Sequence, residues 1–404
     1  MSRVRRTLTL VHRWTGLALA AFLVVIAATG AILPFQTELE RLIAPERFVA
    51  APSPTAQPLD WLTLHRIAEA RSGGIATTLI LHRDGDAAPA YGVVAAPDWP
   101  PLGFDEIVLD PYTGREIARD TDGDLGDGPA QIIPFLFRVH QNLALGDWGT
   151  VLVGVVALAW TLDCFVGFYL TLPAERRRWW PKWGRAWRLR LPATTGFRFA
   201  FDLHRAAGLW LWPMLFVFAW SGVALDLPQV YVPVMRVVIG LADPDPPSQP
   251  EVGRPPALDW PHALAAARAR VREVAARQGV RIERERELRY VTADHRYAYA
   301  LRTSRDKSDN GANTWLYLDA DTGQPIMVAF PTGTRAGNTI DTWLGYLHEA
   351  MVFGLPYRIF VSFVAIAVVG LTTTGVLIWL RKRTAKRWRS DTLITVNVAE
   401  RTKQ

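Results

Sequence analysis

Cysteine is almost absent from this chain of 404 residues, which contains Cys164 alone. Disulfides and thiolate metal sites are therefore excluded, even for a part of the chain that lies in an oxidising compartment. Charge is also sparse, because charged residues make up 21% of the sequence and apolar residues 50%. This mixture fits neither an ordinary soluble enzyme nor a bundle that lies wholly in a membrane.

The apolar residues gather in four long stretches with almost no charge. As a helix that rises about 1.5 Å per residue, each stretch is long enough to cross a hydrocarbon core of roughly 30 Å. The stretches are residues 15–35, 149–172, 205–226 and 357–380. We therefore predict a membrane α-helical protein with four transmembrane helices.

The first 34 residues also resemble a signal peptide, because Arg3, Arg5 and Arg6 precede an apolar run. That run is too long for the apolar region of a signal peptide, and a similar segment returns at residues 204–226. We therefore expect a retained helix.

Short basic segments predict the orientation of the chain. Residues 175–190 contain seven basic residues against one acid, Glu175, and residues 381–383 and the N-terminus are basic too. The positive-inside rule makes all three segments cytoplasmic, with both termini inside. Residues 36–139 carry 8 basic and 16 acidic side chains, as expected of a translocated domain. The net charge of +7 therefore reflects membrane topology and not nucleic-acid binding.

The two halves of the chain repeat each other. The motif His12-Arg13-x-x-Gly16-Leu17 returns as His204-Arg205-x-x-Gly208-Leu209 at an offset of 192 residues. At an offset of 208, His140, Gly146 and Gly167 match His348, Gly354 and Gly375. We infer an internal duplication. The predicted segments are transmembrane helix 1 (1–35), outer domain 1 (36–139), transmembrane helix 2 with its preceding histidine segment (140–172), a basic cytoplasmic linker (173–203), transmembrane helix 3 (204–227), outer domain 2 (228–347), transmembrane helix 4 with its preceding histidine segment (348–380) and a basic cytoplasmic tail (381–404).

The outer domains repeat as well. Apolar positions at helical spacing predict amphipathic helices over 59–72 and 259–278. Strand-like runs follow at 77–82, 91–95, 106–109 and from 115 in the first domain, and at 288–292, 297–302 and 314–318 in the second. Each domain contains an Asp-x-x-Thr-Gly turn, at 110–114 and 319–323. Both domains are therefore expected to be α+β, with one helix and a small antiparallel sheet.

In the order and doubling of these motifs, the chain resembles the PepSY-associated transmembrane family over nearly its whole length. The resemblance implies a multi-pass protein of the bacterial inner membrane with two periplasmic PepSY-like domains, often regulated by iron supply. Members of this family include di-haem reductases that take iron from ferric siderophores by reducing it outside the inner membrane.

Depth in the membrane predicts how the four repeated histidines pair. His12 and His204 begin outward-running helices, so both are expected near the cytoplasmic face, while His140 and His348 precede inward-running helices near the outer face. Each pair would give two axial nitrogens to a haem iron. No Cys-x-x-Cys-His motif is present, so the two haems would be of the b type. Two histidines without clustered carboxylates or thiolates are a poor zinc site and a worse di-iron site.

Each candidate residue also has a structural interpretation. A membrane histidine can hydrogen-bond a carbonyl, although four in two matched pairs favour ligation. Gly16 and Gly208, like Gly30 and Gly222, would let a flat macrocycle approach the backbone or would pack helices together. Arg13 and Arg205 suit haem propionates or lipid phosphates.

Other polar residues receive weaker interpretations. Asp163 beside Cys164 would belong to a proton or quinol site, but no residue of the duplication pairs with it. Glu349, which follows His348, is interpreted as a residue at the rim of the site. His65, His82, His262 and His295 are interpreted as surface or core residues of the outer domains.

The paired histidines therefore predict a haem-dependent electron-transfer protein, and the resemblance to the family implies that it is a ferric-chelate reductase. Electrons would pass from a cytoplasmic or quinol donor through the His12/His204 haem and the His140/His348 haem to a ferric siderophore or another ferric chelate. The transmembrane helices are expected to be surrounded by membrane lipid. A non-enzymatic envelope protein that binds a peptide or protein partner, with structural histidines, is the alternative. A transporter is less expected, because four unbroken spans argue against it.

Overall fold

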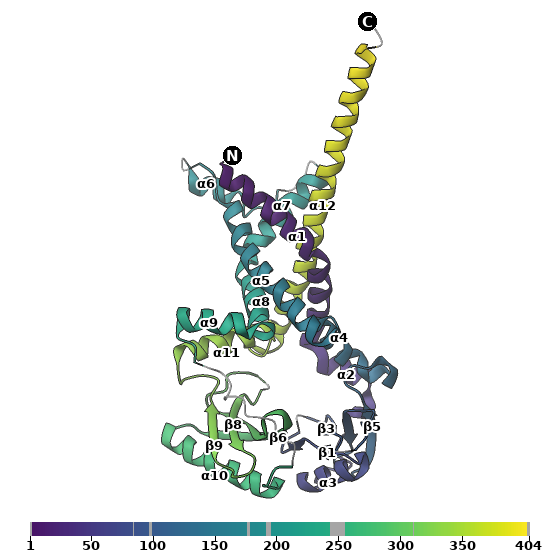
Figure 1. The fold of residues 1–404 in the computed structure, drawn as a ribbon, viewed down its shortest axis with the longest axis vertical. Helices are drawn as coiled ribbons and strands as arrows, with labels where there is room; N and C mark the ends of the chain where they lie inside the picture. Colours follow the sequence, from purple (N-terminus) through teal and green to yellow (C-terminus); the bar gives the residue numbers. More distant parts are fainter. Residues whose placement is uncertain are drawn as a thin grey trace. The chain divides into compact units, whose positions relative to one another are not determined.

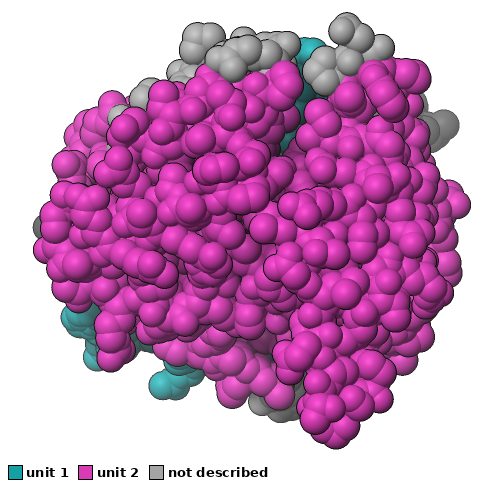
Figure 2. All heavy atoms as spheres, turned by 90° about the horizontal axis from the view of Figure 1, so that it is seen from below, with its two compact units in different colours: residues 1–34, 139–231, 359–404 teal, residues 35–138, 232–358 magenta. Residues whose placement is uncertain are grey.

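The computed structural model describes residues 2–83, 85–96, 99–175, 178–190, 195–242, 255–309 and 311–401, with the backbone alone over 385–401. Six residues of the predicted basic linker, 176–177 and 191–194, lie outside this set. The chain forms two compact units, coloured separately in Figure 2. We call Met1–Pro34, Val139–Tyr231 and Ile359–Gln404 the bundle unit, and Phe35–Arg138 and Val232–Arg358 the sheet unit.

The bundle unit is built from long apolar helices (Figure 1). They are α1 (Arg3–Gly30), α5 (Gly146–Thr171), α7 (Gly196–Trp210), α8 (Trp212–Asp226) and α12 (Gly354–Arg401), with the short α6 (Trp179–Gly184). In the described part of the chain, three helices are long and apolar enough to cross a membrane, or up to four if α7 and α8 count as one span. The chain is thus a membrane protein by the length and composition of its helices.

The third predicted span, residues 205–226, is not one straight helix. It is divided between α7 and α8, which meet at Leu211 with a bend of 69°. Pro213 explains the break, because proline has no N–H and its ring clashes with the carbonyl oxygen four residues earlier, on Leu209. The expectation of four unbroken spans is therefore wrong, and so is the argument against a transporter that rested on it.

Close packing of small residues holds α5 against its neighbours. A Cβ atom added to Gly222 of α8 would lie 3.1 Å from the Cβ atom of Ala157 in α5, and one added to Gly154 would meet Leu227 at 2.5 Å. On the outside, Leu162 and Ile366 are about three-fifths exposed. Leu162 lies on α5 and Ile366 on α12, and exposed apolar side chains of this kind are typical of helix surfaces that face lipid.

The sheet unit contains two small antiparallel sheets and, among its helices, the two that the sequence predicts, as expected of α+β domains. The first helix, α3 (Trp61–Ser72), begins at the cap Asp60 and ends at Gly73, which has φ +67°. The second, α10 (Trp260–Gln278), begins at Asp259 and ends at Gly279, which has φ +63°. Both caps work in the same way, because the carboxylate accepts a backbone N–H of the first turn and glycine adopts the left-handed conformation at no steric cost.

Nine strands make up the two sheets. The four-stranded sheet has the order β1 (Ile75–Ala76), β3 (Ala90–Val94), β4 (Glu106–Leu109), β5 (Glu116–Asp120). The five-stranded sheet has the order β2 (Thr78–Ile80), β6 (Ile282–Val291), β7 (Arg296–Thr303), β8 (Thr314–Asp319), β9 (Pro325–Ala329). β2 comes from the first predicted outer domain and pairs with β6 of the second, with Leu79 opposite Leu288. The two outer segments therefore share one sheet.

The two Asp-x-x-Thr-Gly turns adopt the same structure. In each turn the aspartate carboxylate, of Asp110 or Asp319, accepts backbone N–H bonds from the residues two and three positions later. Gly114 and Gly323 end the turns, each with φ near +67°, and donate to the carbonyl of that aspartate at 2.9 Å. The predicted turns thus connect β4 to β5 and β8 to β9.

Shorter helices complete the chain. They are α2 (Gln36–Ile43), α4 (Ile132–Asn142), α9 (Pro228–Ile239), α11 (Ala336–His348) and the 3-10 turns η1 (Leu33–Phe35), η2 (Pro45–Arg47), η3 (Leu125–Asp127), η4 (Pro129–Gln131) and η5 (Thr292–Asp294). Two of the predicted histidine ligands lie on these elements, His140 on α4 and His348 at the end of α11.

Candidate functional site

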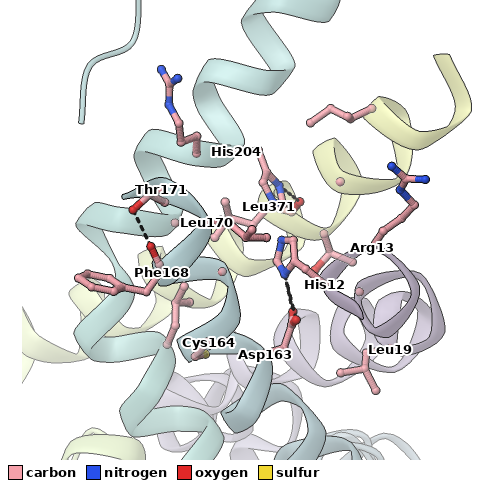
Figure 3. Close-up of a pocket in the computed structure, with 18 of the residues that line it drawn as sticks. His12, Arg13, Leu19, Asp163, Cys164, Phe168, Leu170, Thr171, His204 and Leu371 are labelled. Atoms are coloured by element: carbon pink, nitrogen blue, oxygen red, sulfur yellow. Dashed lines mark hydrogen bonds and ion pairs between the residues drawn. The ribbon is translucent and has the colours of Figure 1, made fainter. Parts of the chain in front are cut away.

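A cavity of about 410 Å³ lies inside the bundle unit, between α1, α5, α7, α8 and α12 (Figure 3). Its volume falls in the range of roughly 300–1,000 Å³ that small-molecule and cofactor sites occupy. Most of its lining is apolar, with Leu19, Leu23, Trp160, Phe168 and Leu215 among the side chains. Residues spaced three or four apart on α1 and on α7 line it because they share one face of the helix.

Six of the eight predicted site residues line this cavity. They are His12, Arg13, Gly16, His204, Arg205 and Gly208. The rings of His12 and His204 have their centroids 6.1 Å apart, with an angle of 61° between the ring planes. Two histidines separated by 192 positions in the sequence thus lie side by side in one cavity.

The Nδ1 atoms of both rings are held by acceptors of the protein. His12 Nδ1 lies 2.9 Å from both carboxylate oxygens of Asp163, the contact drawn in Figure 3. His204 Nδ1 lies 2.9 Å from the carbonyl oxygen of Leu371 and 3.2 Å from the hydroxyl oxygen of Thr374. An imidazole that donates from Nδ1 keeps a lone pair on Nε2. Among the described residues, no hydrogen bond is made by Nε2 of either ring.

A glycine lies beside each ring at matched positions of the repeat. A Cβ atom added to Gly167 would lie 3.3 Å from Cε1 of His12, and one added to Gly375 would lie 3.3 Å from Cε1 of His204. Gly167 and Gly375 match at an offset of 208. Both helices must present hydrogen at these positions for the imidazoles to seat against the backbone.

The site offers two imidazole rings that could bind one metal ion. No cluster of three or more histidine, cysteine or acidic side chains suited to a metal ion occurs among the described residues. Two imidazoles bound on opposite sides of one ion, at roughly 2 Å per metal–nitrogen bond, have ring centroids on the order of 6 Å apart. The separation of His12 and His204 agrees with this value.

The two arginines of the repeated motif differ in their surroundings. Arg205 donates to the carboxylate of the buried Asp202 at 2.8 Å and to the carbonyl of Ala186 at 3.2 Å. Arg13 has no ion-pair partner within the described ranges. Lys382, a residue that the sequence did not single out, also lines the cavity. Arg13 and Lys382 are therefore the cations with free capacity for an anionic group of a ligand, while Arg205 is committed to the protein.

The four small residues weighed as macrocycle neighbours have different roles. Gly16 has no atom within 4 Å of an added Cβ position, and Gly208 has only a side-chain carbon of Leu371 at 4.0 Å. These two glycines leave open space in the cavity wall. Gly222 contacts Ala157 and serves helix packing, and Gly30 lies beside a histidine.

That histidine is His140, which packs against the end of α1. Its Nδ1 lies 2.8 Å from the carbonyl oxygen of Ile26 and 3.3 Å from the hydroxyl oxygen of Thr29, and a Cβ atom added to Gly30 would lie 2.7 Å from Cε1. The second histidine of this predicted pair, His348, belongs to the sheet unit. The pairing of His140 with His348 stays a prediction.

Asp163 is the functional residue whose partner the sequence did not reveal. The sequence suggested a proton or quinol site for it, although no residue of the duplication pairs with it; in the structure its carboxylate contacts a predicted ligand, His12. The offset of 208 places Leu371 at the matching position. The backbone carbonyl of Leu371 accepts from His204 as the carboxylate of Asp163 accepts from His12. A comparison of side chains in the sequence cannot detect a backbone acceptor.

Three histidines of the sheet unit, His65, His262 and His295, make contacts typical of structural residues. His65 is buried, donates from Nε2 to the carbonyl of Ala76 at 3.2 Å and packs on Trp260, with ring centroids 4.6 Å apart. Burial lowers its pKa from 6.5 to about 4. His262 is exposed at the start of α10, and the buried His295 contacts the hydroxyl of Tyr290 at 2.9 Å.

Comparison with known proteins gives one family. The model of the family described as "PepSY-associated TM region" matches residues 9–382, which is most of the chain. The matched range includes every candidate ligand and the whole cavity lining except Arg5. No curated protein matches the sequence.

Proposed function

Since this chain belongs to the family of PepSY-associated transmembrane regions, we propose that it is a haem-dependent membrane electron-transfer protein that reduces ferric chelates. The observation that carries the proposal is the geometry of His12 and His204. Their rings lie 6.1 Å apart in one cavity, and each Nδ1 is held by a protein acceptor. Ligating histidines characteristically donate their second ring nitrogen to a carboxylate or a carbonyl, which fixes the tautomer and the orientation of the ring.

The surroundings of the two rings favour haem over a bare metal ion. A zinc or di-iron site needs three or more ligating side chains placed around one ion, and no such group occurs among the described residues; Asp163 lines the cavity too, but its carboxylate contacts the Nδ1 atom of His12. A flat, largely apolar macrocycle would fill the cavity, with Gly16 and Gly208 leaving room at its faces. Arg13 and Lys382 would face its anionic groups.

Haem iron supplies one-electron chemistry, and the protein supplies ligation, spacing and a dry environment. His12 and His204 would hold the iron through two imidazole nitrogens, a ligand set suited to electron transfer. The buried apolar residues around them would keep water out. The inner site is therefore suited to passing electrons and not to activating a small molecule.

We further propose the finer topology of four spans, with both termini in the cytoplasm and two PepSY-like domains in the periplasm of the inner membrane. Its support is the distribution of basic segments and the internal duplication, which the matched contacts of Gly167 and Gly375 with the two histidines favour. In this topology His140 and His348 would hold a second b haem near the outer face. The acceptor, by resemblance to the family, is ferric iron in a siderophore or another chelate.

The broken third span favours a second candidate, a transporter. Interrupted helices often surround a substrate site in transporters, and here both sides of the break, through Leu209 and Trp212, line the cavity. A transporter with structural histidines would bind no haem, so an absorption spectrum separates the two candidates.

The experiment follows electrons out of the reduced protein. Purified protein in detergent, expressed with adequate haem supply, is reduced with dithionite and mixed anaerobically with a panel of ferric chelates that includes siderophores. We expect the reduced haem spectrum to decay while ferrous iron accumulates in a ferrozine-type trap. The His140→Ala variant, which loses the outer ligand, is expected to block this step while the inner haem still reduces. An unchanged spectrum with every chelate would overturn the reductase proposal.

A further inference from the structure

The two ligands of the cavity have unequal partners at matched positions. His12 contacts the carboxylate of Asp163 through Nδ1, and His204 contacts the carbonyl of Leu371 and the hydroxyl of Thr374. Residues 163 and 371 occupy the same place in the repeat, at an offset of 208. At matched positions of the repeat, His12 therefore contacts a carboxylate and His204 contacts a neutral carbonyl.

We propose that Asp163 is a positioning residue for His12, which fixes the proton of this histidine on Nδ1, directs Nε2 into the cavity and makes His12 the stronger electron donor of the two ligands. The proposal rests on the proposed haem function and adds to it an asymmetry between the two axial nitrogens. It assigns a role to a carboxylate that has no counterpart in the other half of the chain.

The geometry supports positioning because the contact is well formed and its carboxylate is largely shielded from solvent. Both carboxylate oxygens lie 2.9 Å from the Nδ1 atom, within the range of charge-assisted hydrogen bonds. The Asp163 side chain is only 11% exposed. Among the described residues, His12 is its one hydrogen-bond or ion-pair partner. A buried carboxylate without this partner would carry a large desolvation cost, so the two side chains hold each other in place.

The charge also affects the bond that Nε2 would form. A carboxylate behind an imidazole raises the basicity of the ligating nitrogen more than a neutral carbonyl does. A stronger donor stabilises the more oxidised state of the iron, and axial ligands and their hydrogen bonds set the reduction potential of a haem. Asp163 would therefore lower the potential of the inner haem, while the pair Leu371 and Thr374 would orient His204 without this effect.

Two substitutions separate charge from positioning. Asp163→Asn keeps an oxygen that can accept the Nδ1 proton and removes the charge, so the variant should retain haem and show a higher reduction potential. Asp163→Leu introduces the residue found at the matched position and removes both properties. Loss of such an outer partner typically weakens metal binding by roughly ten- to a hundred-fold, and we expect that loss for the inner haem alone. Thr374→Val is the matched control, because the Leu371 carbonyl still holds His204, and its potential should stay that of the parent.

A measurement on haem-free protein tests positioning separately from the haem function. In ¹⁵N-histidine NMR spectra, with the His12 signal assigned from the His12→Ala variant, the parent should show a neutral ring protonated on Nδ1. Asp163→Leu should show a mixture of tautomers. Equal tautomer populations in the parent and in Asp163→Leu would overturn the proposal, because Asp163 would then not fix the proton on Nδ1.

The redox experiment has its own contradicting outcome. If the parent binds haem and Asp163→Asn leaves the potential of the inner haem unchanged, the proposal fails and the haem function stands. If the parent binds no haem, the proposed function fails, and with it the role of Asp163 toward an iron ligand.

Discussion

Three glycines lie beside three of the predicted haem ligands, and alanine substitutions there provide a graded test of the site. The pairs are Gly30 with His140, Gly167 with His12 and Gly375 with His204. Gly370 supplies the control, because it lies on the same helix as Gly375 and a Cβ atom added there meets nothing within 4 Å. All four substitutions add the same methyl group to a helix.

The distances set the expected order of effects. The added Cβ atom would lie 2.7 Å from the His140 ring, a distance at which the ring must move, and 3.3 Å from the rings of His12 and His204, which must give by a few tenths of an ångström. Overpacking of this kind costs about 1–3 kcal/mol. At about 1.4 kcal/mol for each factor of ten, haem affinity should fall by roughly 5- to 150-fold, most at Gly30→Ala.

The assay is a haem titration of haem-free protein in detergent, followed at the Soret band, with a thermal unfolding curve of each haem-free variant beside it. Alanine favours a helix over glycine by about 1 kcal/mol, which offsets part of the overpacking cost, so the unfolding free energy of the haem-free variants should fall by no more than about 2 kcal/mol. Gly167→Ala and Gly375→Ala should weaken the inner haem, Gly30→Ala should weaken the outer one, and Gly370→Ala should weaken neither. Equal haem binding in all four variants would refute the seating of the rings on these glycines.

Two further predictions concern the ligands and the sheet unit. Removing either member of a ligand pair should remove the same haem, so His12→Ala and His204→Ala should give matching spectra, distinct from those of His140→Ala and His348→Ala; four unrelated spectra would contradict pairing by depth. The pKa of His65 is lowered to about 4 by burial, so its neutral form stabilises the fold above about pH 6.5, and that contribution, roughly 3 kcal/mol, is lost as the pH falls toward 4. The measurement is the hydrogen-exchange rate of the α3 amides, corrected for the intrinsic effect of pH. As the pH falls through this window, the rate should rise in the parent and change less in His65→Gln. Equal pH profiles of the two proteins would argue against a buried neutral His65.

Local signals in the sequence predicted much of the sheet unit. The caps of α3 and α10 and the two Asp-x-x-Thr-Gly turns depend on residues within a few positions of one another, and the predicted ranges agree with the observed ones to within a few residues. The first half of β6 was missed because Ile282–Val291 alternates arginine with glutamate, which reads as a solvated segment. Those charges are paired across the structure, as between Arg268 and Glu285 at 2.6 Å.

Long-range and backbone effects explain the remaining differences. The pairing of β2 with β6 joins residues about two hundred positions apart, which no local pattern encodes. The break at Leu211 had a local signal in Pro213, but the apolar composition of residues 205–226 hid it. At the site, matched depth predicted the approach of His12 to His204, whereas the contact of Asp163 with His12 depends on how α1 and α5 are rotated, and the carbonyl of Leu371 carries no side-chain signal.

The haem content of the purified protein tests the central claim most directly. A pyridine haemochrome assay on detergent-purified protein, expressed with adequate haem supply, should give non-covalent b haem approaching roughly two per chain, since each pair of histidines would supply two axial ligands. The double variant His12→Ala/His204→Ala should lose about half of it. Parent protein that is colourless under these conditions, or a double variant that keeps the full haem content, would contradict the account.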